Sequence, residues 1–121
     1  MSLRRTPVFD YDEALRRADH DLETFHMLVE LFVEHGPKEL AEIKAAMDAC
    51  DADAVVRSAH RLKGSVVQFC APTVLEAAIA LERMGRAGDV SSAAPVCAEL
   101  ESRLFQLVAA LREELRKGFA A

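Results

Sequence analysis

The sequence predicts an all-α fold, an antiparallel up-down four-helix bundle with an additional short N-terminal helix. Hydrophobic residues make up 51% of the chain, yet aromatic residues make up only 6%, so the core must consist mainly of aliphatic side chains. Apolar residues recur at steps of three and four, and most of the four prolines and five glycines lie between these periodic segments. Since 121 residues suit one hydrophobic core, we expect a single domain over 1–121.

The first half of the chain predicts three helices. A weak apolar pattern indicates a short helix at 10–18, with Asp10 as its N-terminal cap. A stronger pattern indicates a long helix at 20–35, which a glycine follows as a stop signal. Because proline suits the first turn of a helix, Pro37 predicts the start of a new helix at 37–50.

The second half predicts three more helices. One lies at 53–70, where Asp51 or Asp53 can cap its first turn. A second lies at 73–86 and ends at a turn with two glycines, and a last helix spans 91–117. The connections are short, so successive long helices should be antiparallel neighbours.

Charge and cysteine content exclude several classes of function. A net charge of −5 argues against nonspecific nucleic-acid binding, which needs a basic excess. The cysteines Cys50, Cys70 and Cys97 are odd in number and far apart, so we expect neither a disulfide framework nor a zinc site. No apolar run approaches the roughly 18 residues of a membrane span, and the N-terminus has no secretory signal. We therefore expect a cytoplasmic protein without membrane insertion.

The helix predicted at 53–70 places His60 on its exposed side. Residues three and four positions apart share one side of a helix, and His60 lies opposite the apolar positions. The basic residues Arg57 and Arg61 flank it, and Lys63 follows at the next turn. A neutral imidazole is a nucleophile near pH 7, so this arrangement indicates an anion site with a reactive nitrogen. The positions that share this face are 57, 60, 61, 64, 67 and 68.

Gly64 lies one turn after His60 and calls for a physical explanation. A glycine inside a helix costs about 1 kcal/mol relative to alanine. The missing β-carbon would leave room over the imidazole for a phosphoryl group and for a partner's active site. Lys63 would neutralise the phosphoryl oxygens, and Ser65 could donate a nearby hydrogen bond. The alternative, an ordinary surface histidine, leaves the cost of Gly64 unexplained.

These residues form a recognisable motif. The run His60-Arg61-Leu62-Lys63-Gly64-Ser65 resembles the signature of histidine phosphotransfer (HPt) domains, His-x-Leu-Lys-Gly-Ser. The likeness extends over nearly the whole chain. It includes Leu81-Glu82 and the turn Gly85-Arg86-Ala87-Gly88-Asp89.

The resemblance implies a four-helix bundle that passes phosphoryl groups between aspartates of response-regulator receiver domains. His60 would be the phosphorylated residue, Lys63 its charge partner and Gly64 the residue that leaves room. The chain departs from the family at Cys70, where the family often has glycine. That departure concerns the end of the helix rather than the chemistry.

We therefore predict a phosphorelay intermediate that accepts a phosphoryl group on His60 from a receiver-domain phosphoaspartate and passes it to another receiver domain. The alternative is a helical adaptor that is not phosphorylated and binds or inhibits a receiver or histidine kinase. No nucleotide-binding boxes follow the histidine, so we expect no ATP-dependent kinase activity and no cofactor. The expected partners are receiver domains and a hybrid sensor histidine kinase, and the chain should be a monomer.

Partner binding should involve residues around His60. Arg57 and Arg61 either attract an acidic receiver site or form a solvated face. Val67 either joins a docking patch with the first long helix or belongs to the core. We expect Glu82, Gly85 and Arg86 to serve helix termination and surface pairing. No metal site is expected, because His20, His26 and His35 share no helical face. The candidate partner-binding residues are Arg57, Arg61, Ser65, Val67 and Gln68.

Overall fold

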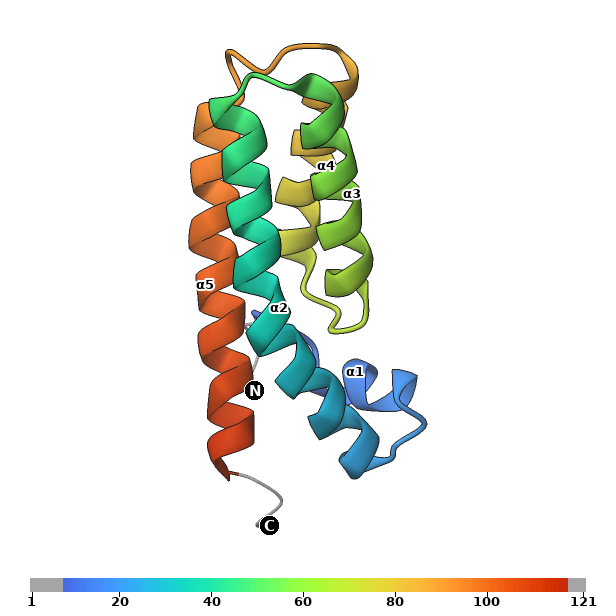
Figure 1. The fold of residues 1–121 in the computed structure, drawn as a ribbon. Helices are drawn as coiled ribbons and strands as arrows, with labels where there is room; N and C mark the ends of the chain where they lie inside the picture. The colour runs from blue at the N-terminus through green and yellow to red at the C-terminus, as the bar shows by residue number, and fades with distance from the viewer. Residues whose placement is uncertain (1–7, 118–121) are drawn as a thin grey trace, which may run out of the picture.

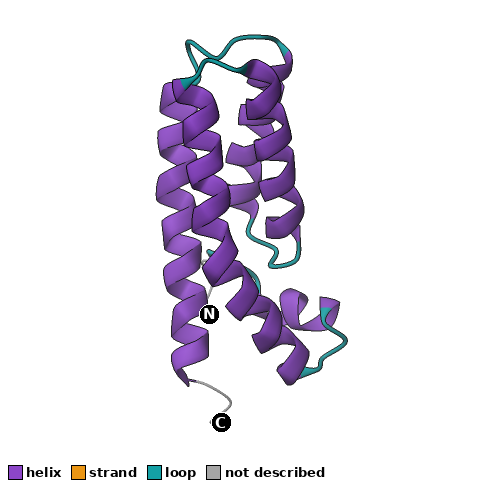
Figure 2. Ribbon diagram, viewed as in Figure 1, coloured by secondary structure: helices purple, strands orange, loops and turns teal. Residues whose placement is uncertain are grey.

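The computed structural model describes residues 8–117, and no β-strand occurs among them (Figures 1 and 2). A short helix, α1, spans Tyr11–Arg17. Four long helices follow: α2 Leu22–Asp48, α3 Ala52–Val67, α4 Pro72–Arg86 and α5 Ala94–Lys117. The predicted all-α bundle with an additional short N-terminal helix is confirmed.

The four long helices pack as an up-down bundle (Figure 1). Contacts join α2 to α3, α3 to α4 and α4 to α5, and α5 closes the bundle against α2. The short helix α1 packs against α2. Each long helix therefore has one side in the core and another facing outward, which leaves one side of α3 available for a site.

Helix α2 corrects the prediction of separate helices at 20–35 and 37–50. It is one continuous helix of 27 residues, with Pro37 inside it. Proline removes one hydrogen bond and crowds the carbonyl four residues earlier, which costs about 3 kcal/mol in a helix interior. The buried stripe continues across it from Phe32 to Leu40, and this burial offsets the cost. In Figure 1 the N-terminal half of α2 leans away from α5, as expected for a proline-containing helix.

Aspartate side chains begin three of the helices. Asp10 accepts a hydrogen bond from the backbone N–H of Glu13, as the sequence predicts. Asp21 caps α2, and Asp51 rather than Asp53 caps α3. Helix α4 has no side-chain cap and begins with Pro72, which needs no partner for a missing N–H.

Two cysteines adopt a backbone conformation that favours glycine. Cys50 has φ 52° and Cys70 has φ 53°, both in the left-handed region. The left-handed turn at Cys70 ends α3 at Val67, before the predicted boundary near residue 70. The backbone carbonyl of Cys70 accepts a hydrogen bond from the N–H of Asp10 at 3.0 Å. The position where this chain departs from the family pattern is thus one where glycine would be free of strain.

An aromatic cluster joins the end of α3 to α2. Phe69 is buried, and its ring centroid lies 5.2 Å from that of Phe32 and 6.5 Å from that of Phe25. Elsewhere the core consists mainly of leucine, valine and alanine, as the composition indicates. None of the helices within residues 8–117 is long and apolar enough to cross a membrane.

Replacing Cys50 with glycine should stabilise the fold. Cys50 is exposed, so the substitution removes strain at positive φ without a loss of core packing. We expect the free energy of unfolding to rise by about 1 kcal/mol in urea titrations. Cys50→Ala keeps a β-carbon at the same φ and should give no gain. Equal stability of the two variants would contradict the assignment of strain to Cys50.

Candidate functional site

His60 lies in the middle of α3 on its outward side. Its side chain is 63% exposed, whereas Ala59 and Leu62 on the opposite side are fully buried. The periodicity that buries α3 therefore presents the imidazole to solvent, as the sequence predicts. A protein partner can approach the ring without any rearrangement of the core.

A buried carboxylate beneath the imidazole, that of Glu82 on α4, organises the site. The residue is only 5% exposed. Its Oε1 lies 2.8 Å from Lys63 Nζ, and its Oε2 lies 2.7 Å from Arg86 Nη2 and 3.1 Å from His60 Nδ1. Hydrogen bonds from Lys63 and Arg86, with a smaller contribution from His60, lower the pKa of Glu82 to about 2. The carboxylate is consequently ionised across the physiological pH range.

The charge of Glu82 determines which nitrogen of His60 is reactive. An ionised carboxylate only accepts hydrogen bonds, so Nδ1 of the neutral imidazole must carry the proton and donate it to Oε2. The lone pair is then on Nε2, the nitrogen that does not face Glu82. This contact supplies the orienting hydrogen bond that the sequence could not assign.

Lys63 is held differently from what its spacing suggests. The position of Lys63 beside His60 predicts an ammonium that contacts phosphoryl oxygens, whereas in the structure Nζ is paired with Glu82. Its side chain is 29% exposed, so the cation lies at the edge of the site beside His60. The Lys63 ammonium can therefore stabilise an anion on His60 in two ways. It can contact the anion and Glu82 at the same time, or it can break its ion pair with Glu82.

Gly64 leaves open space one turn beyond His60. A β-carbon built on Gly64 would have no neighbouring heavy atom within 4 Å. Packing within residues 8–117 therefore does not require glycine here, although glycine in a helix is costly.

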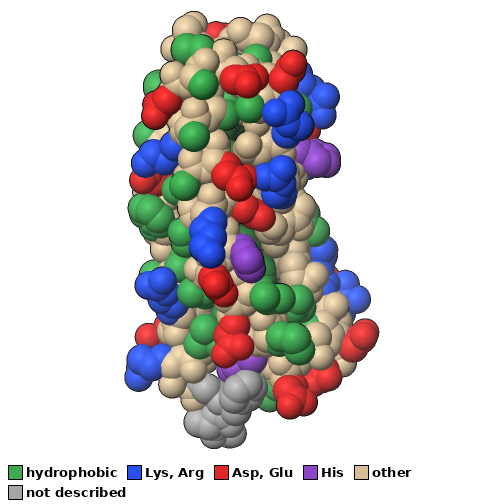
Figure 3. Space-filling view, in the orientation of Figure 1, with side chains coloured by type: hydrophobic (Ala, Val, Ile, Leu, Met, Phe, Trp, Pro, Cys, Tyr) green, Lys and Arg blue, Asp and Glu red, His purple; other side chains and the backbone are tan. Residues whose placement is uncertain are grey.

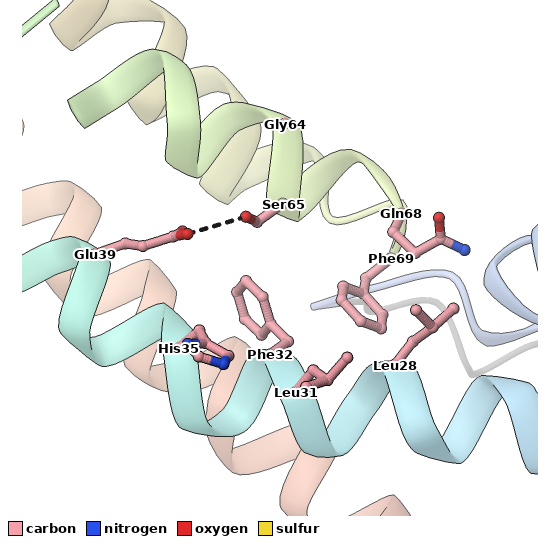
Figure 4. Close-up of a pocket in the computed structure, with 9 residues that line it drawn as sticks. All are labelled: Leu28, Leu31, Phe32, His35, Glu39, Gly64, Ser65, Gln68 and Phe69. Carbon is pink, nitrogen blue, oxygen red and sulfur yellow. Dashed lines mark hydrogen bonds between the residues drawn. The ribbon is translucent and has the colours of Figure 1, made fainter. Parts of the chain in front are cut away.

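Gly64 forms part of a groove between α2 and α3, the α2–α3 groove, with a volume of about 310 Å³ (Figure 4). One end is apolar, and the other carries His35, Glu39 and Ser65, with Ser65 Oγ donating to Glu39 Oε2 at 3.3 Å. Gln68 also lines this groove, whereas Val67 is exposed at 42% and does not belong to the core. The apolar lining residues are Leu28, Leu31, Phe32 and Phe69.

The two arginines near His60 have different surroundings. Arg61 forms an ion pair with Glu42 of α2. Arg57 lines a second hollow, of about 420 Å³, between α3 and α4, and Arg86 lies on its other wall. Cations thus lie beside α3 toward both α2 and α4. Basic and acidic side chains are interspersed on the face of the molecule that Figure 3 shows. Within the described range, no three His, Cys, Asp or Glu side chains are placed to hold a metal ion.

Sequence reasoning missed the role of Glu82 and explained Gly85 incompletely. Glu82 falls on the buried stripe of α4 beside Ala78 and Leu81. A charged residue at a core-facing position of an amphipathic helix was the available signal, since buried charges need partners. A β-carbon on Gly85 would lie 2.9 Å from Val56 Cγ2, so Gly85 permits α3 and α4 to approach closely.

Comparisons with known proteins agree with this fold. A family model described as the Hpt domain matches residues 27–116. Histidine-containing phosphotransfer protein B (HptB) from Pseudomonas aeruginosa PAO1 superimposes with a TM-score of 0.85 at 21% identity, covering 93% of this chain and 97% of that one. The HPT domain of the Hpt sensor hybrid histidine kinase from Shewanella superimposes with a TM-score of 0.81 at 19% identity. The match covers 91% of this chain and 95% of that one. No curated protein gives a significant sequence match.

The bundle, with its outward histidine, is thus of the histidine phosphotransfer class. The chain belongs to the Hpt domain family, whose model covers most of its length. Its function is that of a phosphorelay intermediate in two-component signalling.

Gly64→Ala should separate stability from function. Alanine fills open space and has a higher helix propensity, so the free energy of unfolding should rise by about 1 kcal/mol. Phosphoryl transfer from a protein partner should fall by roughly tenfold or more, because the new methyl group misplaces the approaching site.

Gly85→Ala should have the opposite effect on stability. Its β-carbon meets Val56 at 2.9 Å, so overpacking should lower stability by roughly 1–3 kcal/mol. Chemical denaturation and transfer assays on both variants measure the two effects. Unchanged transfer in Gly64→Ala would show that the open space has no role in partner approach.

Glu82→Gln should shift the tautomer of His60 toward the Nε2–H form. The neutral amide has one acceptor oxygen for the three donors Lys63, Arg86 and His60, so the hydrogen bond that holds the proton on Nδ1 is weakened. Imidazole ¹⁵N NMR, recorded above the pH at which the ring titrates, reports this tautomer. If the population of the Nδ1–H form is the same in Glu82→Gln and the wild-type chain, the charge of Glu82 does not determine the tautomer.

The same variant should show a defined pH dependence of stability. The lowered pKa of Glu82 means that its ionised form stabilises the fold above about pH 4.5, and that this contribution is lost as the pH falls toward 2. Glu82→Gln should therefore be less stable by roughly 2 kcal/mol at neutral pH. The difference from the wild-type chain should shrink in acid.

Proposed function

We propose that His60 is the residue through which this phosphorelay intermediate accepts and donates phosphoryl groups. The observation that carries the proposal is the contact between His60 Nδ1 and the ionised Glu82, which leaves the Nε2 lone pair on an exposed ring. Nucleophilic catalysis by histidine requires this tautomer and this access. Exposure alone would not distinguish His60 from an ordinary surface histidine.

The transfer is a displacement at phosphorus. Nε2 attacks the phosphorus of a receiver-domain phosphoaspartate, an N–P bond forms, and the acyl P–O bond breaks to release the aspartate carboxylate. A second receiver aspartate reverses these steps and leaves His60 neutral. Acyl phosphates and phosphoramidates are both high-energy linkages, so transfer runs in either direction without ATP.

Lys63 and Gly64 support this chemistry through charge and space. Phosphoryl transfer depends mainly on positioning and on electrostatic stabilisation of the transferring oxygens. The Lys63 ammonium, 2.8 Å from Glu82, is close enough to be shared between that carboxylate and a phosphoryl group on the neighbouring ring. The empty space at Gly64 admits the partner's active site.

Docking uses the surface around His60. Arg57 and Arg61 supply positive charge for an acidic receiver site, while Ser65 and Gln68 lie in the α2–α3 groove. Val67 offers exposed apolar surface at the end of α3. We infer that the partners are receiver domains, with a hybrid sensor histidine kinase as one source. We also infer that residues 1–121 act as a single domain, in the cytoplasm and as a monomer.

His60→Gln tests the proposal directly. Incubation with a phosphorylated receiver domain should label the wild-type chain in an acid-labile and alkali-stable form, because a phosphoramidate hydrolyses in acid. The variant should carry no label, although it should still bind the receiver. Label that persists in His60→Gln would place the phosphorylated residue elsewhere. Binding without label in the wild-type chain would favour a non-phosphorylated adaptor.

A further inference from the structure

One carboxylate in the α2–α3 groove lacks the partners that its position demands. Glu39 is half-buried, and its Oε2 accepts a hydrogen bond from Ser65 Oγ at 3.3 Å (Figure 4). Its Oε1 is shielded from water, and no donor among residues 8–117 reaches it. A buried acceptor without a donor destabilises the free protein, so evolution toward stability alone would replace it.

The charged neighbours of Glu39 do not resolve this deficit. Arg61 on α3 attracts the carboxylate over a distance, but its guanidinium donates to Glu42. His35, one turn earlier on α2, contributes a weak attraction. Burial dominates these effects and raises the pKa of Glu39. The side chain is therefore poised to gain from any donor that enters the groove.

We propose that Glu39 is a partner-specificity residue, which binds a lysine or arginine side chain of the receiver domain that docks over His60. The inference rests on the proposed function and names what the groove selects. Gly64 lines the groove one helical turn from His60, so a partner that reaches the imidazole also covers this groove.

The chemistry of the groove favours a cation over other side chains. The apolar end, with Leu28, Leu31 and Phe32, excludes water when covered, which strengthens a charge-assisted hydrogen bond to the carboxylate. The terminal torsion of glutamate is broad, so rotation of the carboxylate lets either oxygen meet the donor. An acidic or apolar side chain at the same place would leave a buried charge unpaired, and receivers that carry one are rejected.

The first experiment compares Glu39→Gln with a matched control. Glu34→Gln removes the same charge from the same helix, but from an exposed side chain paired with Lys38. Receiver domains encoded in the same genome serve as probes, with phosphoramidate as a small phosphoryl donor that needs no docking. Glu39→Gln should weaken binding and slow transfer from the active receiver by roughly tenfold or more. Glu34→Gln should leave transfer within about twofold.

Labelling by phosphoramidate tests the reactivity of His60 separately from the docking role of Glu39. It should proceed equally in the wild-type chain and both variants, because the Glu39 carboxylate makes no hydrogen bond to His60. If no receiver labels the wild-type chain, the proposed function fails and the assignment of Glu39 fails with it. If receivers label the wild-type chain and Glu39→Gln equally fast, and bind both equally well, only the assignment of Glu39 is wrong.

A charge reversal identifies the partner residue. Glu39→Lys should abolish transfer from the active receiver, and replacing the facing lysine or arginine of that receiver with glutamate should restore at least part of it. The proposal requires that a double-mutant cycle between Glu39 and that basic residue of the receiver shows a favourable coupling. Absence of rescue for every basic residue on the receiver's docking face would overturn the proposal.

Discussion

The carboxylate of Glu82 lies between α3 and α4 and receives hydrogen bonds from three side chains, those of Lys63, Arg86 and His60. Lys63 and His60 come from α3, whereas Arg86 comes from α4 itself, so the cluster ties the two helices together at the height of the imidazole. A buried carboxylate is tolerable only with such partners. The donors that make burial of Glu82 tolerable also keep it ionised. Because an ionised carboxylate can only accept a hydrogen bond, these donors also fix the proton of His60 on Nδ1.

The two glycines near the site have opposite relations to their surroundings. Gly85 faces inward, where Val56 and the carbonyl of Ala52 leave no room for a β-carbon. This close approach of α3 and α4 places Glu82 within reach of His60. Gly64 faces outward, where nothing in the described part of the chain competes for the space. Substitution of Gly85 should therefore disturb the packing that assembles the site, while substitution of Gly64 should disturb the approach of a partner protein.

The sequence predicted the bundle and the exposure of His60 because both follow from helical periodicity, which depends only on the order of apolar residues. It failed at Pro37, since local propensity favours a break there, while the continuous buried stripe from Phe32 to Leu40 keeps α2 intact. It also missed the action of Glu82 on His60. These residues are 22 positions apart on different helices, and only the packing of α3 on α4 shows that they meet. The sequence also could not predict the unpaired oxygen of Glu39, because the absence of a hydrogen-bond donor around it within residues 8–117 depends on how the helices pack.

The low pKa of Glu82 has a consequence for signalling. A carboxylate with a pKa of about 2 stays ionised throughout the physiological pH range, so a change of pH within that range does not remove the hydrogen bond that orients the imidazole of His60. This contact therefore gives the phosphorelay intermediate no pH-dependent control at His60. The timing and destination of the signal then depend on which partner proteins are present, how many of them carry phosphate, and how long each remains bound.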